Sequence, residues 1–287
     1  GSTRLHTPHS LGSFGQEALA LAGPCMTVST ACSSSAKAFA VAARWLRLAA
    51  GQGLAFAQNH LGAMYYHGRG VERCDHEAAR WFRRAAEQGD ASAQQNLGHM
   101  CRQGRGMEID PERALSWYYR AAEQGMAGAQ NQLGECYLEG VGAAINYPLA
   151  MAWFRKAALQ GEAAAQLNLG LMYQRGQGVD ASAGEALYWF RKAAAAGERG
   201  AQRELGIAYA EGKGVRLDAR RACAWLQRAA EHGDHEAQFL LATMCVNGRG
   251  VERNEARALE WYTKAAGAGH MGAQYNLANM YAHGRGT

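Results

Sequence analysis

The stretch EAAAQLNLGLMYQRGQGVDASAGEALYWFRKAAAAG, residues 162–197, decides the fold because most of its pattern returns every 36 residues. All seven tryptophans of the chain keep this period. They are Trp45, Trp81, Trp117, Trp153, Trp189, Trp225 and Trp261. A fixed period over most of a chain is the signature of a repeat array, in which each unit packs on its neighbours.

Each unit predicts two helices with a glycine-rich turn between them. In the first full unit, Ala57, Leu61 and Tyr65 fall on one face of a helix at about residues 54–67. A Gly-x-Gly turn ends this helix, and a second helix follows at about residues 75–88. We also expect Gly62 to let a neighbouring backbone come close.

The residue before each second helix supports these boundaries. Five of six units have a side chain that caps helix N-termini well, and only Cys74 does not. The five are Asp110, Asn146, Ser182, Asp218 and Asn254. Pro111 occupies the first helical position, where its missing N–H costs nothing.

The sequence therefore predicts an all-α fold, an α-solenoid of 36-residue helix-turn-helix repeats. Six full units fit between about residues 54 and 269, with half units at both ends. The trailing half unit is a first helix at about residues 271–283 without a second helix. Because repeat arrays usually end in a polar cap, we expect the chain to be a truncated fragment.

The pattern of residues 162–197 resembles the Sel-one-like repeat, a relative of the tetratricopeptide repeat. The shared positions are Ala165-Gln166, Leu169-Gly170, Tyr173, Gly176, Gly178-Val179, Ala186, Trp189-Phe190, Lys192-Ala193-Ala194 and Gly197. The resemblance covers about residues 42–287. It implies a right-handed superhelix of antiparallel helix pairs that serves as a scaffold for protein–protein interaction.

Residues 8–44 do not follow the full repeat and resemble the nucleophile segment of β-ketoacyl synthases, most closely at 23–38. That resemblance implies a strand from Thr27 to Ala31 that delivers an acyl-accepting Cys32 to a helix N-terminus, where the thiolate is stabilised. The partner histidine motifs of that family do not occur outside the repeats. We therefore predict a separate segment 1–36 and a solenoid 37–287, without catalytic residues. The alternative is a fragment or fusion derived from a synthase, with Cys32 as nucleophile.

Composition limits the other classes of function. Charged residues make up 19% and hydrophobic residues 48% of the chain, a balance that excludes a disordered protein. No apolar run reaches the ~18 residues of a membrane span, and a net charge of +5 is too small to indicate nucleic acid. The seven cysteines contain no CxxC motif, so no metal or cofactor is predicted.

Two further observations leave questions open. Gly1-Ser2 resembles a cloning scar that replaces a native leader, so the compartment stays open between cytoplasm and periplasm. The second helices also carry a basic column, which we interpret as their solvated side. The alternative is that this column binds phosphate or an acidic partner. The column is Arg84, Arg120, Lys156, Lys192, Arg228 and Lys264.

The predicted function is a non-catalytic scaffold that binds a protein or peptide, not nucleic acid or membrane, on a concave face made by the first helices. Three columns on these helices vary from unit to unit, as expected where the fold imposes no choice. The candidate contact residues are Asn59, His99, Arg102, Asn131, Glu135, Leu167, Leu171, Arg203, Phe239, Val246 and Tyr275.

This set predicts an extended or helical peptide with apolar anchors near Phe239 and Tyr275 and polar contacts near Asn131 and Glu135, because exposed apolar groups in a groove mark interaction sites. The alternative is that some of these side chains pack against the neighbouring first helix. The oligomeric state is not predicted.

Overall fold

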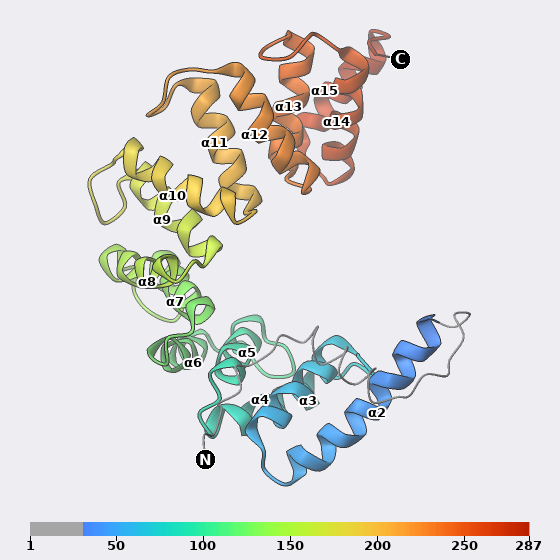
Figure 1. Cartoon of the computed structure of the whole chain (residues 1–287), viewed down its shortest axis with the longest axis vertical. Coiled ribbons are helices and arrows are strands. Elements are labelled where there is room, and N and C mark those ends of the chain that lie inside the picture. The colour runs from blue at the N-terminus through green and yellow to red at the C-terminus, as the bar shows by residue number, and fades with distance from the viewer. Residues whose placement is uncertain (1–30, 287) are drawn as a thin grey trace, which may run out of the picture. The chain divides into compact units, whose positions relative to one another are not determined.

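A computed structural model describes residues 31–286, and all its regular structure in that range is helical (Figure 1). The helices are α2 (Ala31–Gly51), α3 (Ala55–His67), α4 (Asp75–Glu87), α5 (Ala91–Gln103), α6 (Pro111–Glu123), α7 (Ala127–Glu139), α8 (Tyr147–Leu159), α9 (Ala163–Arg175), α10 (Ala183–Ala195), α11 (Arg199–Glu211), α12 (Ala219–Glu231), α13 (His235–Asn247), α14 (Glu255–Gly267) and α15 (Met271–Ala282). The predicted all-α repeat solenoid is confirmed for this part of the chain.

The odd-numbered helices α3 to α15 are the first helices of their repeats, and the even-numbered helices α2 to α14 are the second helices. Both predicted boundaries in the first full unit agree with the structure to within one residue. Gly68 ends α3 with a left-handed φ of 69°. Asp110 caps α6 by accepting a hydrogen bond from the Arg113 N–H, whereas Cys74 makes no side-chain cap on α4. The helices form two compact units, one ending at Met126 and the other starting at Ala127, and each is described by itself.

An aromatic or leucine side chain from the second helix fills the space left by a glycine of the first helix. A Cβ on Gly134 would lie 2.7 Å from the Phe154 ring, and a Cβ on Gly62 would lie 2.7 Å from Phe82. The nearest atoms at Gly62 thus belong to a ring, and at the equivalent Gly170 a backbone atom, the Ala186 carbonyl oxygen, also lies within 3.2 Å of such a Cβ.

A closer backbone approach occurs at the second glycine of some Gly-x-Gly turns. A Cβ on Gly106 would collide with the Asp75 carbonyl oxygen at the start of α4, in the preceding repeat. Gly250 meets the Ala219 carbonyl oxygen at the start of α12 in the same way. Both glycines also have positive φ. At these two turns, backbone contact sets the spacing to the preceding second helix, whereas Gly178 and Gly214 meet side-chain atoms of that helix first.

Buried glutamines of the first helices and exposed glutamines of the helix-ending turns form a chain of hydrogen bonds that connects successive helices. Gln94 donates from Nε2 to the Ala86 carbonyl oxygen at 3.2 Å, and its Oε1 accepts from Gln124 Nε2 at 2.8 Å. Gln58 is bonded in the same way by Gln88, 30 residues later. We call this arrangement the glutamine chain.

The glutamine chain is incomplete at two repeats. Gln166 donates to the Ala158 carbonyl oxygen at 3.1 Å, but residue 196, where the next donor belongs, is alanine. Its Oε1 is buried without a hydrogen-bond partner among the described residues. The same is true of Gln238, since its donor position is Ala268.

The tryptophan column lies in the core for most of its length. Trp117, Trp153, Trp189 and Trp261 are 6–8% exposed, as expected for a core column, but Trp45 on α2 is 64% exposed. The basic column is solvent-exposed, as interpreted from the sequence. Its charged groups also lie over the tryptophan rings, for example Lys156 Nζ at 4.0 Å from the Trp153 centroid. A cation at this distance attracts the ring, so the column also covers the core.

The N-terminal predictions fall largely on residues that the structure does not describe. Residues 27–30 of the expected strand lie outside the described range, and so does the Cys32 side chain. The backbone of Ala31 and Cys32 is already helical within α2, so the strand expected to end at Ala31 does not extend to that residue. The boundary between residues 36 and 37 stays a prediction.

Candidate binding surface on the first helices

The candidate contact residues all lie on first helices, and we call the three predicted columns together the A-helix face. In the compact unit that ends at Met126, two polar side chains of this face form hydrogen bonds within the protein. Asn59 is 8% exposed and accepts a hydrogen bond from Asn96 Nδ2 at 3.1 Å. His99 Nδ1 lies 3.0 Å from the Tyr118 hydroxyl, and burial, followed by the charge of Arg102, lowers the pKa of His99.

In the compact unit that starts at Ala127, the polar pair Asn131 and Glu135 is arranged in the same way. Asn131 is 3% exposed, donates to Glu135 Oε1 at 2.9 Å and accepts from Asn168 Nδ2 at 3.0 Å. Asn59 and Asn131 therefore join neighbouring first helices, which differs from the expectation that their whole column is open to a partner.

Three other candidates also bridge successive first helices. Leu167 covers Gly200, where a Cβ would lie 2.8 Å from the leucine Cδ2. Phe239 stacks on His270 with ring centroids 4.6 Å apart. Arg203 forms an ion pair at 2.8 Å with Asp234, which is 7% exposed. Packing against the neighbouring first helix, the alternative stated from the sequence, thus holds for these positions.

The remaining candidates in the second unit are more open. Leu171 and Val246 are half-buried and rest on the core, and Tyr275 on α15 is 70% exposed. The structure therefore brings the candidates onto one kind of helix but divides them into bridging residues and accessible ones.

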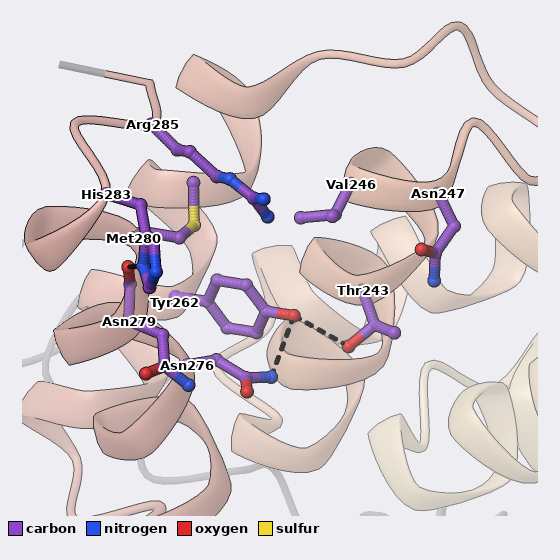
Figure 2. Close-up of a pocket in the computed structure, with 9 residues that line it drawn as sticks. All are labelled: Thr243, Val246, Asn247, Tyr262, Asn276, Asn279, Met280, His283 and Arg285. Atoms are coloured by element: carbon purple, nitrogen blue, oxygen red, sulfur yellow. Dashed lines mark hydrogen bonds between the residues drawn. The ribbon is translucent and has the colours of Figure 1, made fainter.

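A pocket of about 390 Å³ opens on the A-helix face at α13, α14 and α15 (Figure 2). It is lined by Thr243, Val246, Asn247, Tyr262, Asn276, Asn279, Met280, His283 and Arg285. We call it the α15 pocket. Among the predicted contact residues, only Val246 belongs to it.

A directed chain of hydrogen bonds forms one wall of the α15 pocket. The Thr243 hydroxyl donates to the Phe239 carbonyl oxygen at 3.0 Å, so it accepts from the Tyr262 hydroxyl, which lies 2.9 Å away. The Tyr262 hydroxyl in turn accepts from Asn276 Nδ2 at 3.0 Å. Figure 2 shows the bonds to Thr243 and Asn276 meeting at the Tyr262 hydroxyl oxygen.

The variable columns include Thr243 and Asn279, but the predicted contact residues leave out every polar residue of the α15 pocket, although a signal was present. The column that contains Phe82, Phe154 and Phe190 contains tyrosine only at Tyr118 and Tyr262. Both hydroxyls bond to a polar residue of the first helix, which is His99 or Thr243. A phenylalanine-to-tyrosine change opposite a new polar residue therefore indicates a polar wall.

The described residues contain neither a cluster suited to a metal ion nor a helix suited to a membrane span. No cluster of three or more histidine, cysteine or acidic side chains able to hold a metal ion occurs between residues 31 and 286. Within the same range, no helix has the length and apolar character needed to cross a membrane.

Comparison with known proteins identifies the repeat. The Sel1 repeat is recognised at residues 39–54, 55–90, 91–126, 127–162, 163–198, 200–234, 235–270 and 272–287. No match was found among the curated proteins. None of the comparisons supports the resemblance of the N-terminal segment to β-ketoacyl synthases.

Solved structures show the same fold. A Sel1 repeat protein from Oxalobacter formigenes is 32% identical, with a TM-score of 0.76, over 88% of this chain and 96% of that one. A protective antigen of uropathogenic Escherichia coli, described as having an SLR fold, is 38% identical with a TM-score of 0.69. The match covers 85% of this chain and 52% of that antigen, so this chain spans about half of its length.

Proposed function

The chain belongs to the Sel1 repeat family, and from this premise we propose that it binds a partner protein or peptide through its A-helix face. Members of this family are generally protein-interaction scaffolds and typically have no enzymatic activity. The proposal adds where the partner binds and which side chains contact it.

The contrast between the core columns and the A-helix face carries the proposal. The core position at Leu61 is leucine in all seven first helices. Two residues further on, the A-helix face has a different side chain in every unit: Ala63, His99, Glu135, Leu171, Ile207, Thr243 and Asn279. A position that the fold leaves free can be adapted to a partner, since recognition depends on a few well-placed side chains.

The accessible residues of the compact unit that starts at Ala127 are the best candidates for contact with a partner. Tyr275 presents an exposed aromatic ring on α15, and Val246 lies on the preceding first helix, α13. Phe239, also on α13, is held by its stack on His270, so it offers a rigid apolar edge. The partner segment is an extended or helical peptide anchored here, with polar contacts near the Asn131–Glu135 pair.

Selection of peptides on the intact chain tests the proposal. A display library of random peptides is selected on the whole protein, and the binders are measured by titration. The double substitution Phe239→Ala with Tyr275→Ala should weaken binding by about 2 kcal/mol or more and leave helicity unchanged.

The matched control is Tyr188→Ala, which removes an aromatic ring that is 49% exposed but lies on a second helix. Equal losses for the control and the double variant would contradict the proposal. A loss caused only by charge reversal at Arg228 and Lys264 would assign binding to the basic column instead.

A further inference from the structure

We propose that the α15 pocket binds a carboxylate group of the peptide ligand, an inference that rests on the proposed function. The pocket volume of about 390 Å³ lies within the ~300–1,000 Å³ range of ordinary ligand sites. It is large enough for one carboxylate and the residue that carries it.

The lining of the pocket has several hydrogen-bond donors and the cationic Arg285 but no carboxylate. Neither aspartate nor glutamate occurs among the nine lining residues. The side chains able to donate to an anion are Asn247, Asn276, Asn279, His283 and Arg285. Such a lining favours an anionic ligand group over a cationic one.

Arg285 differs from the arginine at the same position of an earlier repeat. Arg105, also the middle residue of its Gly-x-Gly turn, bonds both Asp75 oxygens at 2.7 and 3.0 Å and stacks 3.7 Å from the Tyr66 centroid. This bond is the largest cause of the lowered pKa of the Asp75 carboxyl. Arg105 is therefore fully engaged within the protein.

Neither partner of Arg105 has an equivalent that engages Arg285. The residue that corresponds to Asp75 is Glu255, and Arg253 binds its carboxylate at 2.6 Å. The residue that corresponds to Tyr66 is the smaller Val246. Among the described residues, the Arg285 guanidinium has no ion pair or side-chain hydrogen bond, and Figure 2 shows it extended over the pocket toward Val246.

The rest of the pocket is held in place for such a ligand. The Tyr262 hydroxyl fixes the Asn276 amide by accepting one of its N–H groups, and the amide keeps a second N–H. A guanidinium binds a carboxylate through two parallel hydrogen bonds, and neighbouring amides complete the set. The carboxylate has two chemical sources, a peptide C-terminus or an aspartate or glutamate side chain.

Chemical-shift titration of the intact chain with three small probes tests the inference. The probes are N-acetyl-alanyl-alanine with a free carboxylate, the same dipeptide as its amide, and N-acetyl-aspartyl-alanine amide. We expect saturable shifts of the amide signals of Thr243, Asn279 and Arg285 with the first probe, and binding at least about fivefold weaker for its amide. Binding of the third probe at the same signals identifies a side-chain carboxylate as a second accepted source, and its failure restricts the site to C-termini.

Substitutions distinguish binding of the carboxylate in the α15 pocket from a general attraction by positive charge. Arg285→Gln should weaken the carboxylate probe by at least about tenfold, and Asn279→Ala should weaken it less. Arg249→Gln is the matched control, because it removes the same charge from the preceding Gly-x-Gly turn, where the guanidinium donates to the Ala210 carbonyl oxygen. Equal losses for Arg249→Gln and Arg285→Gln, or equal binding of acid and amide, would overturn the inference.

The outcome is independent of the test of the proposed function. Selected peptides that need Tyr275 but tolerate C-terminal amidation and Arg285→Gln would overturn the carboxylate site and leave the proposed function intact. Probe binding at Arg285 without any selected peptide on the A-helix face would leave the carboxylate site and contradict the proposed function.

Discussion

Completing the glutamine chain should stabilise the protein. Ala196→Gln places a donor amide at the position that Gln88 and Gln124 occupy in earlier repeats, where each reaches the glutamine 30 residues before it. The new side chain should donate to Gln166 Oε1, which is buried without a partner among the described residues. The backbone needs no change, because Ala196 has φ −79° and ψ 1°, close to the −82° and 0° of Gln88.

The expected gain is about 1 kcal/mol in the free energy of unfolding. A hydrogen bond contributes about 1 kcal/mol net, and an unsatisfied buried acceptor costs about 1–3 kcal/mol. Ordering a glutamine side chain costs up to about 1.5–2 kcal/mol, and this cost is partial here because the equivalent glutamines remain exposed. In urea, with a slope of about 3 kcal/mol/M, the unfolding midpoint should rise by about 0.3 M.

Tryptophan fluorescence during urea unfolding measures the change. Ala195→Gln is the matched control, because the neighbouring residue is also exposed but points about 100° away around the helix. The reverse substitution, Gln124→Ala, should lower stability by about 1 kcal/mol by removing the donor to Gln94. Equal midpoints for the two glutamine variants, or a gain that persists in the Gln166→Leu background, would refute the reasoning.

The remaining predictions concern glycine, tryptophan and cysteine. Gly134→Ala should lower the free energy of unfolding by about 1–3 kcal/mol, because its Cβ would lie 2.7 Å from the ring it faces; Gly184→Ala should raise it by about 0.4–1 kcal/mol, because a Cβ there meets nothing within 4 Å. Trp189→Ala should cost about 3–5 kcal/mol, and a loss in the array interior should split the unfolding transition. Trp45→Ala should cost far less, because the Trp45 side chain is 64% exposed. Burial raises the pKa of the Cys223 thiol from 9.0 to about 11, so the folded state favours the protonated thiol. The stability that the buried, protonated Cys223 thiol contributes should be present below pH 9. It should decline as pH rises from about 9 to 11, since the unfolded thiol ionises first.

Urea titrations of the glycine and tryptophan variants test the first two of these predictions. Stability losses of equal size at Gly134 and Gly184, or at Trp189 and Trp45, would show that burial does not decide the cost. For Cys223, the unfolding free energy between pH 8 and 11 is compared with that of Cys223→Ala. Parallel pH profiles for the two proteins would contradict the assigned cause.

Most of the fold could be predicted from the 36-residue period of the sequence. The first helix predicted at residues 54–67 and the second at 75–88 correspond to α3 and α4, because caps and glycine turns are local signals that need no tertiary context. Cys101 and Cys245 replace tyrosine in one column of the first helices, and each is 1% exposed. Their place in the column therefore indicates their burial in the core. Trp45 shares the register of the buried tryptophans and is nevertheless 64% exposed, because register alone does not show what covers a side chain.

The binding surface was predicted less well because a column shows which face a residue shares, not what already occupies it. Asn59 and Phe239 have the register of open positions, yet one bonds to Asn96 and the other stacks on His270. Those contacts are made 31 to 37 residues away in sequence, so they depend on the angle between successive repeats. Arg285 was missed for the converse reason, because its turn position is engaged in the repeat of Arg105.

The contact between Gly106 and the Asp75 carbonyl oxygen, and between Gly250 and Ala219, has a consequence for how such a gene changes. At these two turns the contact joins a glycine to a backbone carbonyl, so this contact does not depend on which side chain the preceding repeat carries. When a block of 36 residues is duplicated or deleted by unequal recombination, this contact can therefore form again between the new neighbours. Point mutation can then diversify the outward residues of each new copy, while the glycine that joins the copies stays the same.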